Sequence, residues 1–319
     1  MPPGTYVLML MFFDHKTHWI YRALSNKHFY LFAIVAGTCV QLNSKENKEY
    51  FSIARKLKRL SFTILKKFIK NNYDKIMNRI VKKVMPVQSL DLIVGSTHYV
   101  INSYANSYPI TSKTKKRFIH HHDYDRFLEN NLEEKNIVTF IDTFEPFHPD
   151  YILSNTKQID PKIYYDQLNA FFDFIEQKYN TTIVIAEHPK SYYDQLPDYF
   201  KGRKRVKWQT AKYIAQSRFV ITHESTSLSL IILYNKPMIL LNFTNTTEYL
   251  TRTMNDIRYY LNKKVTVFNK DDLSNVDIDL TIDDKIYKKM KDEYLVGSDT
   301  NHTPLMHQVR AILKTNLKK

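Results

Sequence analysis

The sequence has few of the features that indicate a secreted, disulfide-linked or membrane-spanning protein. Cys39 is the only cysteine in 319 residues, which excludes an internal disulfide framework and favours a reducing compartment. No uncharged stretch reaches the roughly 18 residues that a spanning helix needs. The apolar start, Met1 to Phe13, has no positively charged segment and no small-residue cleavage site, so we expect no signal peptide. These absences together predict a cytoplasmic protein.

Acidic residues are scarce relative to basic ones. The chain has 47 Lys and Arg against 32 Asp and Glu, a net charge of +15, which predicts an anionic partner without identifying it. Twelve of the basic residues and only two acidic ones lie within residues 48–83, so this stretch alone carries +10. No zinc-finger spacing, RNA-recognition signature or Gly-rich basic tract points to nucleic acid. We therefore expect no nucleic-acid partner.

Residues 48–83 also show a helical pattern. Apolar side chains recur there at spacings of three and four, which predicts one long or two consecutive amphipathic helices with a basic face. One interpretation is a core-packed helix with a solvated charged face. The other is attachment to an anionic membrane surface or to a lipid-linked diphosphate acceptor, which would make the protein peripheral at the inner face of the membrane.

Apolar β-like runs alternate with helical patterns along the whole chain. This alternation predicts an α/β fold with parallel sheets covered by helices, and the length suits two domains of about 150 residues. A polar cluster at residues 130–136 suggests the boundary. We therefore predict two Rossmann-like domains. Residues 1–133 form an N-terminal domain with the basic helices, and residues 134–319 form a C-terminal doubly wound domain with closing helices.

Polar residues follow three predicted strands of the second half. Asp142 follows residues 137–141, His188-Pro189-Lys190 closely follows residues 182–186, and Glu224-Ser225-Thr226-Ser227 closely follows residues 219–222. Ligands of an open parallel sheet bind beyond the carboxyl ends of the strands. We therefore expect these polar residues to share one rim of the sheet.

The residue types at this rim suit a phosphate. Hydroxyls of Ser225, Thr226 and Ser227, together with backbone N–H groups at a helix start, can hold an anion, and the same residues can also be ordinary helix caps. His188 can donate to a diphosphate or protonate a leaving phosphate, and Lys190 adds positive charge. The alternative is a purely structural histidine.

Asp142 is the carboxylate best placed to act as a general base on an acceptor hydroxyl. The alternative for Asp142 is a residue that caps the turn after its strand. Asp123 and Asp125 are rival candidates on the acceptor side. The histidines before them, His120 to His122, suggest a metal, but adjacent residues on an extended chain point in opposite directions. We therefore predict no metal site.

Several stretches resemble enzymes that transfer sugars. The run from Thr210 to Ser227, followed by Asn235-Lys236-Pro237-Met238-Ile239, resembles the donor-nucleotide half of two-domain GT-B enzymes. In that family a helix, a strand, a small-residue phosphate loop, a helix and a "KP" strand recur in this order. His188-Pro189 with Ser225-Thr226 is similar to the HP and Ser/Thr motifs of bacterial sialyltransferases and Kdo transferases, whose donors are CMP-sugars.

Three further stretches resemble proteins of bacterial capsule and lipopolysaccharide clusters; they are Phe140-Ile141-Asp142, Phe147-His148-Pro149-Asp150 and His122-Asp123-Tyr124-Asp125. The chain departs from the GT-B pattern because its phosphate loop lacks the usual pair of glycines and Leu228 to Tyr234 contains no acid for the donor ribose. The acidic-acidic-Gly base motif of sialyltransferases and the Asp-x-Asp metal motif are also absent. The resemblance thus implies a GT-B-like, metal-independent transferase without a cofactor, whose second domain binds the nucleotide sugar.

Three hypotheses follow from these observations. The first is a glycosyltransferase that moves a sugar from a CMP- or UDP-sugar to a surface polysaccharide or lipid-linked acceptor. The second is an enzyme of the UDP-N-acetylglucosamine 2-epimerase type, which shares the GT-B-like fold. The third is a non-catalytic GT-B-like docking or assembly protein, which the basic helices and the missing ribose carboxylate suggest.

Overall fold

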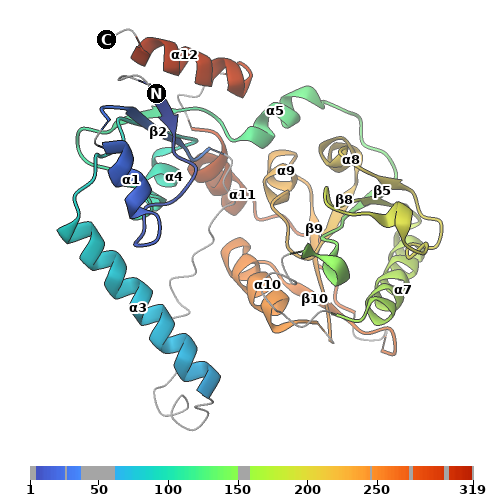
Figure 1. The fold of residues 1–319 in the computed structure, drawn as a ribbon. Coiled ribbons are helices and arrows are strands. Elements are labelled where there is room, and N and C mark those ends of the chain that lie inside the picture. The colour runs from blue at the N-terminus through green and yellow to red at the C-terminus, as the bar shows by residue number, and fades with distance from the viewer. Residues whose placement is uncertain are drawn as a thin grey trace. The chain divides into compact units, whose positions relative to one another are not determined.

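The computed structural model describes residues 5–25, 27–36, 62–149, 159–244, 246–272, 276–297 and 302–317. The chain divides into two compact units, each with its own parallel sheet (Figure 1). Unit 1 comprises residues 1–38, 45–122 and 292–319, and unit 2 comprises residues 39–44 and 123–291. The predicted α/β class with two helix-flanked parallel sheets is confirmed.

Unit 1 has a four-stranded sheet in the order β1-β2-β3-β4, with every neighbouring pair parallel. The strands are β1 (Tyr6–Leu8), β2 (Tyr30–Ile34), β3 (Leu92–Gly95) and β4 (Lys115–Phe118). Its helices are α1 (His18–Ser25), α3 (Phe62–Val84), α4 (His98–Ser103) and α12 (Leu305–Leu317). Among the strands that the structure describes in unit 1, the order follows the chain without reversal.

The two faces of the first sheet are covered by different helices. Phe32, Leu92 and Val94 form a buried cluster with Val309 of α12. Strand residues one position away point to the opposite face, where Gly95 is so close to α4 that an added Cβ would lie 2.6 Å from Ile101 Cγ1. The C-terminal helix therefore groups with unit 1, whereas the sequence placed it in the second domain, because its apolar face covers the first sheet.

Unit 2 has a six-stranded parallel sheet in the order β10-β9-β8-β5-β6-β7. The strands are β5 (Ile137–Ile141), β6 (Thr182–Ala186), β7 (Arg205–Val206), β8 (Phe219–Thr222), β9 (Met238–Phe243) and β10 (Val265–Phe268). Counted from β5 as the first strand, this is the doubly wound order 3-2-1-4-5-6, which reverses between β5 and β8.

The connections within and around unit 2 are mostly helical. They are α5 (His122–Glu129), η2 (Glu145–Phe147), α7 (Pro161–Tyr179), η3 (Tyr193–Gln195), α8 (Thr210–Gln216), α9 (Leu228–Leu233), α10 (Glu248–Leu261), α11 (Asp284–Met290) and the π-helical turn η4 (Lys291–Leu295). Asp160 caps α7 by accepting from the Ile163 N–H, and Pro161 occupies the first helical position. The apolar face of α7 includes Phe171 and Phe172, which are completely buried against the sheet.

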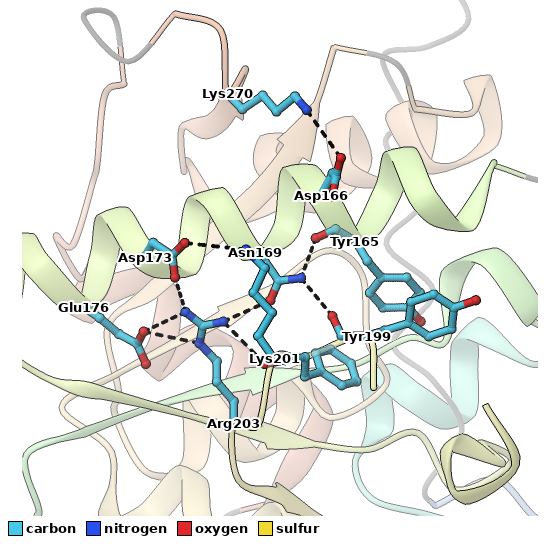
Figure 2. A network of polar contacts seen from close by, with 10 residues as sticks. Tyr165, Asp166, Asn169, Asp173, Glu176, Tyr199, Lys201, Arg203 and Lys270 are labelled. Atoms are coloured by element: carbon cyan, nitrogen blue, oxygen red, sulfur yellow. Dashed lines mark hydrogen bonds and ion pairs between the residues drawn. The ribbon is translucent and has the colours of Figure 1, made fainter. Parts of the chain in front are cut away.

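A polar network fastens α7 to the loop before β7 (Figure 2). Arg203 donates to Asn169 Oδ1 at 2.9 Å and to Glu176 Oε2 at 2.8 and 3.2 Å, and it also pairs with Asp173. Asn169 Nδ2 in turn donates to the backbone oxygens of Tyr165 and Tyr199 at 2.7 and 2.8 Å. The network thereby fixes the part of α7 that presents its tyrosines to the polar edge of the sheet.

Candidate functional site

Three adjacent strands of unit 2 end at the same level. Ile141 of β5 is in register with Ala186 of β6 on one side and with Thr222 of β8 on the other. The loops that begin at Asp142, Glu187 and His223 therefore leave the sheet side by side. The reversal of strand order lies between β5 and β8, which is where ligands of doubly wound sheets bind.

Asp142 is buried at the end of β5 and joins two of these loops. Its Oδ1 accepts the Phe144 N–H at 3.0 Å, and its Oδ2 accepts the Tyr193 hydroxyl at 3.0 Å and the His188 N–H at 3.4 Å. Burial raises the pKa of Asp142 to about 6, although these hydrogen bonds oppose the rise. The carboxylate thus holds the loop after β6 against the loop after β5.

A second tyrosine extends this buried network. The hydroxyls of Tyr165 and Tyr193 lie 2.7 Å apart. Because Tyr193 donates its proton to Asp142, the Tyr165 hydroxyl is the donor between the two tyrosines. Tyr165 belongs to α7 and Tyr193 to η3, so the network links the helix before β6 and the segment after it to the end of β5.

His188 lies half-buried in the loop after β6. Its Nδ1 accepts the backbone N–H of Lys190 at 3.2 Å. An imidazole whose Nδ1 accepts carries its hydrogen on Nε2 in the neutral form. His188 therefore has a defined tautomer with an Nε2–H donor, and its ring packs edge-on against His148, with the ring centres 5.1 Å apart.

The hydroxyl cluster follows β8 and leads into α9. Ser225 Oγ accepts the Ser227 N–H at 3.1 Å, and Ser227 occupies the N-cap position of α9 without a side-chain cap bond. The Ser229 hydroxyl contacts the Thr226 carbonyl oxygen at 3.1 Å and the carboxylate of Asp123. The serines and threonine therefore form a turn whose conformation is fixed by their own hydrogen bonds and by α5.

Glu224 is a further carboxylate at the reversal point, one that sequence reasoning noted in the rim but did not assign a role. It is half-buried, and burial raises its pKa while a hydrogen bond with the Thr253 side chain opposes the rise. It stands directly between the end of β8 and Ser225. The signal in the sequence was its position, the second residue after a predicted strand and the first of the polar cluster.

His223, which precedes Glu224, has a structural role. Its Nδ1 lies 2.6 Å from the Leu241 carbonyl and its Nε2 lies 2.9 Å from the Tyr164 hydroxyl. A carbonyl only accepts, so Nδ1 carries the hydrogen and Nε2 accepts from Tyr164. Complete burial lowers the pKa of His223 to about 4, so the ring is neutral near pH 7.

Asp123 and Asp125 lie in the first turn of α5. Asp123 is buried and accepts from Ser229 of α9, so it supports the hydroxyl cluster of unit 2. One ligand atom each of His121, His122 and Asp123 lies within 4.8 Å of the others. The sequence-based prediction of no metal assumes an extended chain at these residues. In the structure the chain is helical from His122, where α5 begins. The prediction of no metal stays a prediction.

The described residues contain no helix long and apolar enough to cross a membrane.

Lys190, the remaining predicted phosphate ligand, is exposed and follows His188 in the loop after β6. The structure thus brings Asp142 and His188 into direct contact. It joins the hydroxyl cluster to Asp123 through Ser229.

No protein-family model and no curated protein matches the sequence. Among solved structures, the chain is similar to MnaA of S. aureus bound to UDP, with 12% identity, a TM-score of 0.40 and coverage of 98% of this chain and 76% of that one. It is also similar to the UDP-GlcNAc 2-epimerase of Methanocaldococcus jannaschii, with 10% identity, a TM-score of 0.39 and coverage of 91% and 72%. A variant of the wall teichoic acid polymerase TagF gives 9% identity, a TM-score of 0.43 and coverage of 100% and 90%. Similarities this low assign no activity to the chain.

Proposed function

We propose that the protein is a metal-independent glycosyltransferase that uses a nucleotide sugar, CMP- or UDP-linked, as donor. The observation that carries this proposal is the reversal of strand order between β5 and β8, together with the side chains that follow these strands. Doubly wound sheets bind nucleotides at this point. Hydroxyl, imidazole and carboxylate groups follow the strands around this point, and these are the groups that bind a sugar diphosphate or monophosphate.

In this proposal the donor phosphate lies between the hydroxyl cluster and the loop after β6. Ser225, Thr226 and Ser227 supply hydroxyl and backbone donors from one side. His188 donates from Nε2, the nitrogen that its bond with the Lys190 N–H leaves protonated, and Lys190 adds charge. Because α9 has only six residues, the hydroxyls contribute more than a helix dipole would.

The two carboxylates take different roles. General-base catalysis needs a carboxylate that reaches the acceptor hydroxyl and whose pKa approaches the working pH. The predicted base, Asp142, has a pKa raised to about 6 but is buried and engaged by three donors, so we assign it the positioning of the His188 loop. Glu224 is half-buried rather than buried and also has a raised pKa, so we propose Glu224 as the base.

The same proposal includes the acceptor and the transfer of the sugar to it. A sugar acceptor presents a hydroxyl, and a surface polysaccharide or a lipid-linked glycan provides one. The nucleotide leaves with the electron pair of its bond to the anomeric carbon, while the acceptor proton passes to Glu224. Hydrogen bonds from His188 and the hydroxyl cluster stabilise the departing phosphate, so this mechanism assigns no role to a metal or cofactor.

Binding of the free nucleotides tests the phosphate site. We expect CMP or UDP to bind to the wild-type protein in calorimetric titration, and Ser225→Ala with Ser227→Ala to weaken binding on the order of a hundredfold or more, because each of the two charge-assisted hydrogen bonds contributes about 1.5–3 kcal/mol. Thr181→Ala, which removes a hydroxyl in the same unit that donates to the Asn136 carbonyl oxygen before β5, is the matched control. Unchanged affinity in the double variant, or in His188→Ala, would refute the site.

Turnover tests the assigned carboxylate. Glu224→Gln should retain nucleotide binding and lose transfer of the sugar, on the order of a hundredfold or more for a general base. Release of nucleotide that requires an acceptor identifies a transferase, whereas conversion of the nucleotide sugar without any acceptor identifies an epimerase. Full activity of Glu224→Gln would remove it as the base.

A further inference from the structure

We propose that the exposed apolar stripe of α3 docks unit 1 onto an anionic lipid bilayer. The stripe consists of Tyr73, Ile76, Ile80 and Val84, which are 56%, 54%, 46% and 66% exposed. Their spacings of three, four and four residues place them on one face of the helix. Four adjoining large apolar side chains at such exposure are unusual on a protein surface without a partner.

The contacts of α3 with the rest of unit 1 show that this face points outward. Asn78 Oδ1 accepts the backbone N–H of His15 at 2.7 Å and lies 2.8 Å from its Nδ1, and Asp74 pairs with His15 Nε2 at 3.3 Å and with Lys16 at 3.5 Å. Val81, on the same side of α3, is buried. The helix is therefore fixed through positions 74, 78 and 81. Tyr73, at one end of the stripe, also packs edge-on against the His15 ring, and Ile76, Ile80 and Val84 lie on a different face.

The length of α3 carries the stripe beyond the sheet. Its 23 residues span about 35 Å at 1.5 Å per residue, whereas the strands of unit 1 have three to five residues. Figure 1 shows α3 as the long helix of this unit, with its N-terminal end away from the four strands. In the sequence the same spacing of three and four continues from Tyr73 back to Ile69, Leu65 and Phe62.

A basic stripe borders the apolar one. Lys75, Arg79 and Lys83 are exposed, and in the described part of the chain none of them pairs with a carboxylate. Lys82 instead donates to the backbone oxygen of Asn106 in unit 1. From Phe62 to Val84 the helix has seven basic residues and one acidic residue, Asp74, which is already paired with His15 and Lys16. The outward side of α3 therefore combines an apolar face with unpaired positive charge.

Charge complementarity indicates which partner binds the apolar and basic stripes of α3. A basic amphipathic helix lies in the interface of an anionic bilayer with its apolar face among the acyl chains and its cations at the headgroups. Nucleic acid would use the cations but not the apolar stripe. A second copy of this chain would bring two faces of the same positive charge together. The bilayer is the partner that uses both stripes, and this inference is independent of the proposed reaction.

Co-sedimentation with vesicles tests the inference on the full chain. We expect the protein to bind vesicles of phosphatidylcholine with 30% phosphatidylglycerol and to bind vesicles of phosphatidylcholine alone at least tenfold more weakly, because each cation near an anionic surface contributes about fivefold. Raising the salt concentration should weaken binding to the anionic vesicles.

Two double variants test the contributions of the apolar and basic stripes to vesicle binding separately. Ile76→Ser with Ile80→Ser, and Arg79→Gln with Lys83→Gln, should each reduce binding to anionic vesicles on the order of tenfold or more. The matched controls lie on helices of unit 2: Ile163→Ser, which removes an isoleucine 49% exposed on α7, and Lys285→Gln with Lys289→Gln on α11. We expect the controls to bind like the wild type, and circular dichroism should show that all variants are folded.

Three results would overturn the inference. The first is wild-type protein that does not bind anionic vesicles. The second is equal binding by the stripe variants and the controls. The third is a dimer in sedimentation velocity that Ile76→Ser with Ile80→Ser dissociates while vesicle binding persists, which would assign the stripe to a second copy of the chain.

Discussion

The two parallel sheets differ in their strand order and in what they leave exposed. The order in unit 2 reverses between β5 and β8, and buried or half-buried polar groups gather beyond those strands. The order in unit 1 follows the chain from β1 to β4 without reversal among its described strands. Its distinctive exposed feature is apolar, on α3. In our proposals, the same class of sheet thus carries a site for a small polar ligand in one unit and a docking helix for a membrane surface in the other.

This difference shows how connectivity directs function. Where the order reverses, the helices after adjacent strands diverge to opposite faces and open a space at the carboxyl edge. Where the order runs in one direction, right-handed crossovers keep the helices on one face. A long connecting helix such as α3 then extends past the sheet, and its outer face is available to a partner.

The largest effect is expected in the core of unit 2. Phe172→Ala removes a completely buried ring between α7 and the sheet and should lower the free energy of unfolding by about 3–5 kcal/mol. Denaturant titration followed by circular dichroism measures this loss. A loss below about 1 kcal/mol would contradict the tight packing that distinguishes this unit.

Asp142 should make the stability of unit 2 depend on pH. Its carboxyl has a usual pKa of 3.8 and a folded pKa of about 6, so between these values the folded protein binds a proton that the unfolded chain releases. The stabilisation from Asp142 is present below about pH 4 and is lost as the pH rises to 6, a change of about 3 kcal/mol.

His223 acts in the opposite direction. Its pKa falls from 6.5 to about 4 on folding, so its contribution is present above pH 6.5 and is lost as the pH falls toward 4. In the wild-type protein, the contributions of Asp142 and His223 to the free energy of unfolding change in opposite directions with pH and offset each other. As the pH falls from 6.5 to 4, the free energy of unfolding of Asp142→Asn should therefore decrease. That of the wild type should decrease only weakly, because Asp142 offsets His223. Parallel pH profiles of the two proteins would contradict the assigned pKa of Asp142.

Arg203 should matter less than the core ring. Arg203→Ala removes the hydrogen bonds and ion pairs to Asn169, Glu176 and Asp173 and should cost about 2 kcal/mol of unfolding free energy. Arg203→Lys should recover part of this loss, since lysine keeps the charge but not the planar fork. Thermal unfolding of both variants measures the difference, and equal stability of Arg203→Ala and wild type would show that the network is dispensable.

In unit 1, Gly95→Ala should lower stability by about 1–3 kcal/mol. The new Cβ would lie 2.6 Å from Ile101 Cγ1, and overpacking of a filled core costs about this much. Ile101→Ala, which removes the Cγ1 that the new Cβ would meet, should relieve part of the strain in the double variant. Additive losses from the two substitutions in denaturant titration would show that these side chains do not compete for space.

The smallest effect on stability is expected on α3. Ile76→Ser with Ile80→Ser replaces exposed side chains and should change the free energy of unfolding by less than about 1 kcal/mol. The same double variant should lose vesicle binding. In unit 1, a substitution should thus remove membrane docking with little change in the free energy of unfolding. A large loss of stability would mean that the stripe packs against the protein itself.

Much of the fold could be predicted from local patterns. The apolar run at 219–222 and the helical spacing after Pro161 predicted β8 and α7 with nearly the observed bounds. The strand β8 is a short, continuously apolar run that is buried at every position, and α7 repeats its apolar residues at the helical period. The place of α12 could not be predicted in this way. Its amphipathic pattern does not say which sheet it covers, and the pairing of Val309 with Phe32 is a contact between the two ends of the chain.

The candidate site was predictable in outline only. The rule that ligands bind at the carboxyl ends of parallel strands selected Asp142, His188 and Ser225 from sequence. The burial of Asp142 and its bond with Tyr193 depend on how the segment after β6 folds back to the end of β5. The proximity of Asp123 to Ser229 likewise depends on the packing of α5 against α9, and no periodicity encodes these two contacts.

Thermal unfolding with CMP, CDP, UDP, GDP and their sugars tests the central claim most directly, because a ligand that binds only the folded state raises its stability by mass action. We expect a CMP- or UDP-containing ligand at a hundred times its dissociation constant to add about 2.7 kcal/mol. Ser225→Ala with Ser227→Ala should abolish most of this gain. Equal stabilisation of that variant and the wild type, or no stabilisation by any nucleotide, would contradict a phosphate site between β5 and β8.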